Sequence, residues 1–165
     1  MANAIVGIQN LKLWSKKMNT SFIKKLMTSN AGFSALALRI PAAIIFIAHG
    51  AQKLFAWFGG YGLEGTGQWM ESIGLTPGYE LTLLAGSAEF FGGIALLVGL
   101  MVRPAALLLS ITMIVAIFSV HIANGLFMSN NGYEFGLALL AISVSLMFSG
   151  AGKLSLDNIL KQRLA

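Results

Sequence analysis

The sequence contains no cysteine, and only 10% of its 165 residues are charged. The lack of cysteine excludes a disulfide framework, an iron–sulfur cluster and a thiolate zinc site built from this chain alone. An ordinary soluble domain has about 25% charged residues. With so little charge and 56% hydrophobic residues, the chain cannot form a surface that is compatible with water. Most of its surface must therefore face lipid, which excludes a soluble enzyme.

The few charges are unevenly distributed, with a formal net charge of +5. Five lysines fall within the first 25 residues: Lys12, Lys16, Lys17, Lys24 and Lys25. This clustering suits an anionic lipid surface better than a folded basic face that binds nucleic acid. We therefore expect membrane lipid as a partner, and no nucleic acid.

Four apolar runs are candidates for crossing the bilayer, which requires about 20 residues each. They cover approximately residues 33–58, 79–100, 104–123 and 133–150. The last is the shortest and contains three serines, so it should pack on the other helices. The sequence predicts an all-α polytopic membrane protein with one four-helix transmembrane domain over residues 31–152. Residues 1–30 form a basic segment before it, and residues 153–165 a short basic tail.

Lysine and arginine also predict the orientation. They occur in the N-terminal segment, at Arg103 between the second and third spans, and in the tail, whereas the loops 59–78 and 124–132 contain none. By the positive-inside rule, both termini should be cytoplasmic in a bacterial inner membrane. Arg39 lies near the cytoplasmic end of the first span and is expected to anchor at the headgroups.

Two segments outside the spans have their own predictions. Residues 4–27 carry apolar side chains every three or four positions, which indicates an amphipathic helix lying on the cytoplasmic leaflet. A partly disordered basic tail is the alternative, because Asn19, Thr20 and Ser21 can interrupt the helix. The loop 63–74 is expected to hold a short surface helix.

Ionisable residues within the spans need a partner, a water cavity or a purpose, because hydrocarbon disfavours charge. His49, Gln52 and Lys53 project from one side of the first span, and Glu89 lies near the middle of the second. Counting about 1.5 Å per residue places His49 and Glu89 at similar depth, so that they can face each other. His121 and Glu134 lie closer to the level of Lys53. Small residues around Glu89 leave room for a pocket, and this cluster can hold or pass a proton.

The alternative is a structural network of ion pairs that fixes the packing of the helices. In that case His121 only bonds a loop carbonyl, and Lys53 and Glu134 reach toward water. No pair of His and Glu residues has a spacing diagnostic of a metal site, so none is predicted.

Several short motifs resemble the DoxX-like family of small four-helix bacterial membrane proteins. They are Arg39-Ile40, His49-Gly50-Ala51-Gln52-Lys53-Leu54, Glu89-Phe90-Phe91-Gly92-Gly93, Gly99-Leu100, Arg103-Pro104-Ala105-Ala106, His121, Gly132-Tyr133-Glu134 and Gly150-Ala151-Gly152-Lys153-Leu154-Ser155-Leu156-Asp157. The family is similar to the membrane subunit of thiosulfate:quinone oxidoreductase, and other members are associated with oxidoreductase systems and with thiol or quinone stress. The family pattern falls on the same polar residues: His49, Lys53, Glu89, His121 and Glu134.

These observations lead to one hypothesis with two alternatives. The chain is predicted to be the membrane component of an oxidoreductase system that binds a quinone-like ligand, with Glu89 and His49 exchanging protons as the catalytic pair. The residues expected to bind the ligand are Lys53, Gln52, His121 and Glu134. Electrons would come from a redox partner subunit or a diffusible reductant. The alternatives are a non-catalytic partner subunit and a small proton-coupled transporter, and the bundle is also a candidate for a homo-oligomer.

Overall fold

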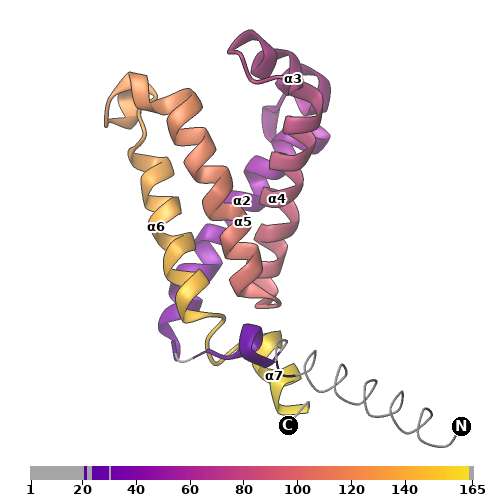
Figure 1. Ribbon diagram of the computed structural model, residues 1–165, viewed down its shortest axis with the longest axis vertical. Helices are drawn as coiled ribbons and strands as arrows, with labels where there is room; N and C mark the ends of the chain where they lie inside the picture. The colour runs from indigo at the N-terminus through magenta and orange to yellow at the C-terminus, as the bar shows by residue number, and fades with distance from the viewer. Residues whose placement is uncertain (1–20, 22–23, 30, 164–165) are drawn as a thin grey trace, which may run out of the picture.

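The computed structural model describes residue 21, residues 24–29 and residues 31–163, and within these ranges it contains helices and no strands. The main helices are α2 (Ser34–Phe55), α3 (Gly62–Ser72), α4 (Gly78–Val98), α5 (Val102–Ala116), α6 (Glu134–Ser149) and α7 (Leu156–Arg163) (Figure 1). The all-α prediction is confirmed, as is the short helix expected within residues 63–74. The amphipathic helix predicted over residues 4–27 lies mostly outside the described residues.

Three helices are long and apolar enough to cross a membrane: α2, α4 and the continuous helical stretch from Val102 to Asn124. That stretch begins as α5 and ends with a π turn, η2 (Ile117–His121), and a 3-10 turn, η3 (Ile122–Asn124). The fourth expected span is α6, which has 16 residues and therefore a length of about 24 Å. Because α6 is shorter than the bilayer core, the fourth crossing stays a prediction.

The helices form two arms that meet at one end of the molecule. In one arm α2 packs along α4, and in the other α5 packs along α6. The arms are close together near α7 and separate toward the end where α3 lies (Figure 1). The core near the closed end contains fully buried Phe46, Leu96, Leu109 and Leu146.

The closed end is held by Asp157 of α7, which is 1% exposed. Its carboxylate accepts hydrogen bonds from the backbone N–H groups of Met101 and Val102, at 2.7 and 3.1 Å. Met101 precedes α5 and offers no capping side chain, so Asp157 satisfies N–H groups that the helix itself leaves open. The basic tail predicted for residues 153–165 therefore contains a docked helix.

Two arginines complete this closed end, which we call the hairpin junction (Arg39, Arg103, Asp157 and the groups they bind). Arg39 is 1% exposed and donates to the Leu154 carbonyl at 2.7 Å. The expectation that Arg39 anchors at the headgroups is therefore wrong.

Arg103 donates to the carbonyls of Thr28 and Met147, so it joins α5 to the segments before α2 and at the end of α6.

Candidate functional site

The centre of the candidate site is an ion pair between α2 and α4. Lys53 Nζ donates to Glu89 Oε2 at 2.6 Å. The Glu89 side chain is 4% exposed and that of Lys53 is 23% exposed, so the carboxylate is buried and the ammonium lies at an edge. Removing either partner would leave a charge without compensation in an apolar setting.

Glycines allow the two helices to come close enough for this pair. Gly50, one turn before Lys53, lies against the backbone of Gly86 and Phe90, and Gly93 lies against Ala43 and Ile47. A side chain at Gly50 would collide with backbone atoms of α4. The small residues around Glu89 thus bring α2 and α4 together, as small residues do in other membrane helices.

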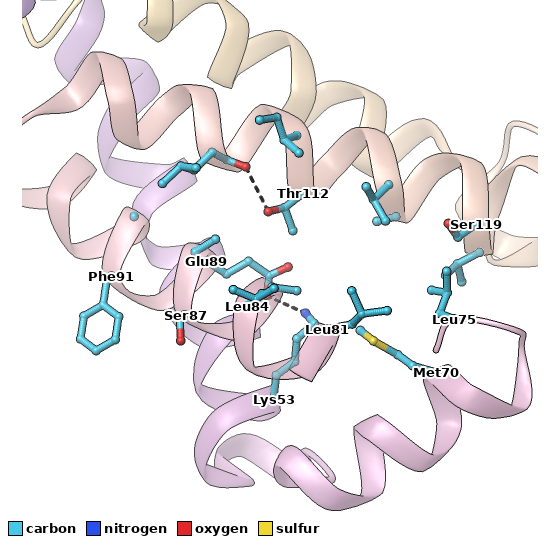
Figure 2. A pocket seen from close by; sticks show the side chains of 18 of the residues that line it. Lys53, Met70, Leu75, Leu81, Leu84, Ser87, Glu89, Phe91, Thr112 and Ser119 are labelled. Carbon is cyan, nitrogen blue, oxygen red and sulfur yellow. Dashed lines mark hydrogen bonds and ion pairs between the residues drawn. The ribbon is translucent and has the colours of Figure 1, made fainter. Parts of the chain in front are cut away.

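The ion pair faces a cleft of about 1040 Å³ between α4 and α5, with Trp69 and Met70 of α3 lining one end of it (Figure 2). Most of the lining is apolar and comes from both helices, including Leu84, Ala88 and Gly92 of α4 and Leu108, Ile111 and Val115 of α5. In Figure 2, Glu89 and Lys53 point into the space between the helices, whereas Phe91 points away from it. A large apolar cleft with a few polar groups is the usual form of a small-molecule site.

His121 also lines the cleft, at the end of the π turn that follows α5. Its Nδ1 lies 2.9 Å from the Asn131 carbonyl oxygen, which can only accept. Nδ1 therefore carries the hydrogen, and in the neutral ring Nε2 is a hydrogen-bond acceptor. The loop-carbonyl bond considered from the sequence is present, and His121 is also placed beside the cleft.

The other predicted site residues lie elsewhere. His49 has an exposed side chain, its ring contacts Phe135 of α6 at a centroid distance of 6.1 Å, and it does not line the cleft. The expected face-to-face arrangement of His49 and Glu89 is therefore not the one observed, because Lys53 occupies the place opposite Glu89. Glu134 accepts from the Met128 N–H at 2.6 Å and stabilises the loop before α6.

Gln52 lies beside the ion pair but outside the apolar cleft. Its amide nitrogen donates to the Phe58 carbonyl at 3.2 Å, and the residue lines a separate polar recess next to α3. Of the residues singled out from the sequence, Lys53, Glu89 and His121 line this cleft, whereas His49, Gln52 and Glu134 do not. The aliphatic wall from α5 was not predicted, because helix periodicity does not show which faces of two helices stand apart.

Comparison with known proteins identifies the family of the chain. The DoxX family profile matches residues 34–122, which include Lys53, Glu89 and His121. The chain belongs to the DoxX family. No solved structure matches the chain.

Curated DoxX relatives are similar over most of their length. A Bacillus subtilis protein named "Putative oxidoreductase CatD" is 35% identical over 131 residues, which cover 79% of this chain and 90% of that protein. The Escherichia coli "Inner membrane protein YqjF" is 35% identical over 134 residues, 78% of this chain and 92% of its own. A Haemophilus influenzae protein of unassigned activity is 36% identical over 128 residues, 73% and 86% of the two chains. Together with the apolar helices, these relatives identify the chain as a bacterial inner-membrane protein of the DoxX family.

Proposed function

We propose that this DoxX protein is the membrane component of an oxidoreductase system and binds a quinone-like molecule in the cleft between α4 and α5. The observation that carries the proposal is the Lys53–Glu89 ion pair set in the wall of an otherwise apolar cleft. The name of the Bacillus subtilis relative favours an oxidoreductase over the other classes. The same cleft without redox chemistry would serve a non-catalytic partner subunit.

The apolar part of the cleft suits the ring and tail of such a ligand. Its rim includes exposed aliphatic side chains on both helices, with Leu84 67%, Leu108 53% and Ile111 50% exposed. In a membrane these side chains contact lipid, so an apolar ligand can enter sideways without crossing water.

The polar groups suit the oxygen atoms of a quinone ring. The Lys53 ammonium donates hydrogen bonds and suits a quinone oxygen, which only accepts. The Glu89 carboxylate and His121 Nε2 accept hydrogen bonds and suit the hydroxyl groups of the reduced hydroquinone. Reduction of a quinone adds two electrons and two protons, and hydroquinone oxidation releases them. The Lys53–Glu89 pair supplies or takes up the protons. The electrons come from a partner protein or a diffusible reductant.

Fluorescence titration tests this proposal directly, because Trp69 lines the cleft. A Trp14→Phe, Trp57→Phe background leaves Trp69 as the single tryptophan of the chain. Decylubiquinone and menadione should quench its emission in a saturable manner. The hydroquinone decylubiquinol, whose hydroxyl groups donate to a carboxylate, should bind to Glu89→Gln about 10- to 100-fold more weakly than to the parent, since hydrogen bonds to charged groups are worth about 1.5–3 kcal/mol.

Glu80→Gln provides the matched control, because Glu80 is an exposed carboxylate in the first turn of the same helix. It should bind both quinones as the parent protein does. Equal binding of decylubiquinol by the Glu89→Gln protein and the parent, or no saturable quenching by any of these ligands, would contradict the proposal.

A further inference from the structure

The ion pair lies beside two hollows, the second of which has the larger polar share in its lining. Beside the apolar cleft there is a polar recess of about 650 Å³ on the α3 side, lined among others by Gln52, Lys53, Tyr61, Thr66, Trp69 and Asn131. Lys53, Trp69 and Asn131 line both hollows. Among the described residues, Lys53 is the one charged side chain shared by the two.

The two members of the pair differ in the hollows that they line, since Lys53 lines both and Glu89 only the apolar cleft. Glu89 lines the apolar cleft and is not among the described residues that line the recess. Lys53 extends from Glu89 to the recess, and its greater exposure of 23% against 4% agrees with this position. A proton that reaches Glu89 from water must therefore pass through Lys53 or through the apolar cleft.

We propose that the polar recess is the aqueous entrance of the site, through which protons reach the Lys53–Glu89 pair from the α3 end of the protein. The apolar ligand enters separately, from the lipid between α4 and α5. The reaction that the entrance serves rests on the proposed function, whereas the entrance itself rests on the two hollows and their shared lysine.

The lining of the recess suits water. Gln52 of α2, Thr66 and Trp69 of α3 and Asn131 of the loop before α6 bring amide, hydroxyl and indole groups to the same lining as Lys53. The titratable groups that line the two hollows beside the pair are His121 on η2 and Tyr61 before α3, and His49 lies one turn before Lys53 on α2 with its ring against Phe135. None of them lies between Lys53 and Glu89, which are in direct contact.

The proton step is balanced at this pair. An N–H bond of the Lys53 ammonium breaks and an O–H bond forms at Glu89, which leaves both side chains neutral. A proton from water in the recess then restores the ammonium, and the Glu89 proton passes to an oxygen atom of the ligand. In the opposite direction the same groups release ligand protons to the α3 side.

The absence of cysteine allows a clean accessibility experiment with single-cysteine variants. The probe is the membrane-impermeant thiol reagent MTSET, applied to right-side-out and inverted membrane vesicles. Thr66→Cys reports the recess, and Ala88→Cys, a small residue that lines the cleft but not the recess, is its matched control. Lys53→Cys reports whether water in the recess reaches the ion pair.

We expect MTSET to label Thr66→Cys and Lys53→Cys from the same single face of the membrane. Ala88→Cys should not react with MTSET and should react with the apolar reagent N-phenylmaleimide. Filling the recess with Thr66→Trp should abolish labelling of Lys53→Cys. Since Lys53→Cys alone leaves Glu89 without its partner, the labelling is repeated in the Lys53→Cys, Glu89→Gln protein.

Two results would overturn the entrance: no labelling of residue 53 by MTSET from either face, or labelling from the face opposite to Thr66→Cys. Neither result depends on quinone binding. Failure of the fluorescence titration with successful labelling would remove the proposed ligand and leave the entrance in place.

Discussion

Gly50 of α2 packs directly against the backbone of Phe90 in α4, at a point where no larger residue fits. This contact sets the separation of the two helices one turn away from the place where Lys53 meets Glu89. The ion pair therefore depends on a residue that has no side chain of its own to contribute.

Gly50→Leu should separate α2 from α4 and weaken both the fold and the site. We expect a loss of at least about 1–3 kcal/mol, the usual cost of an overfilled core, measured as a lower thermal midpoint in detergent. Decylubiquinone affinity should fall as well. Ile44→Leu is the control, since Ile44 lies on the same helix with a side chain that is 59% exposed. An unchanged midpoint for Gly50→Leu would show that the helices do not touch there.

A double-mutant cycle separates the structural role of the ion pair from its role in binding. Lys53→Met and Glu89→Leu each leave one charge without a partner, and each should destabilise the protein by up to about 3–5 kcal/mol. The combined variant should regain most of that stability, because an apolar pair replaces a buried charged pair at little cost. Quinone binding should not return. If binding did return in the stable double variant, the pair would be structural only.

Two substitutions at His121 distinguish its ring nitrogens. Asn places an amide N–H near the position of Nδ1, whereas Gln reaches farther toward the position of Nε2. His121→Asn should keep the bond to the Asn131 carbonyl, and with it the thermal midpoint, while lowering the affinity for the hydroquinone, whose hydroxyl group can donate to Nε2. His121→Gln should instead loosen the loop, measured as faster proteolysis between residues 124 and 132. The reverse pattern would assign Nδ1 to the ligand.

Asp157→Asn should destabilise the hairpin junction, because an amide cannot accept from both Met101 and Val102 through two oxygens. We expect a loss of about 0.5–2 kcal/mol, typical of a lost helix cap. Arg39, which is buried beside the carboxylate, would also lose a nearby negative charge.

The effect of Asp157 should also depend on pH. Burial raises the pKa of its carboxyl above the ordinary 3.8, against the opposing effects of the Met101 and Val102 N–H groups and of Arg39. Because the pKa is higher in the folded than in the unfolded state, the contribution of Asp157 to the free energy of unfolding is largest below pH 3.8. It is lost as the pH rises through the pKa of the folded state. The parent protein should therefore exceed Asp157→Asn in stability by more near pH 3.5 than at pH 7, in thermal melts at both values. A difference that grows with pH would show the opposite shift.

Reporter fusions test the predicted orientation. Green fluorescent protein at the C-terminus should fluoresce, and alkaline phosphatase inserted after Asn130 should be active, because the first reporter functions in the cytoplasm and the second outside it. If the C-terminal fluorescent protein were dark, and alkaline phosphatase fused to the C-terminus were active, the orientation would be the opposite of the one predicted.

The helices, and the two charged residues that form the ion pair, could be recognised from the sequence, although their pairing with each other was not predicted. Apolar runs mark the helices, and the rarity of charge in a span draws attention to Lys53 and Glu89. His49 was paired with Glu89 from depth alone. Depth gives the level along a helix but not the direction around it, and that direction is set by the glycines at the contact with α4.

The hairpin junction was not predicted, although its signal is present. Met101 and Val102 begin α5 without a capping side chain nearby, so their N–H groups need an acceptor from another part of the chain. Asp157 lies 55 and 56 residues away from them, a separation at which no local pattern relates the three. The burial of Arg39 was missed for the same reason.

The two arms are joined at the hairpin junction and stand apart at the α3 end, so they can move relative to each other only about the junction. The hydrogen bonds of Asp157 and Arg103 fix that end. A change in the width of the cleft therefore requires the helices to bend, or to rotate about the hairpin junction. Since α4 is 21 residues long, a small tilt at its fixed end is magnified over about 30 Å at the tip. A truncation that removes α7, or a tag that displaces it, would therefore change the width of the cleft at a distance from the ligand.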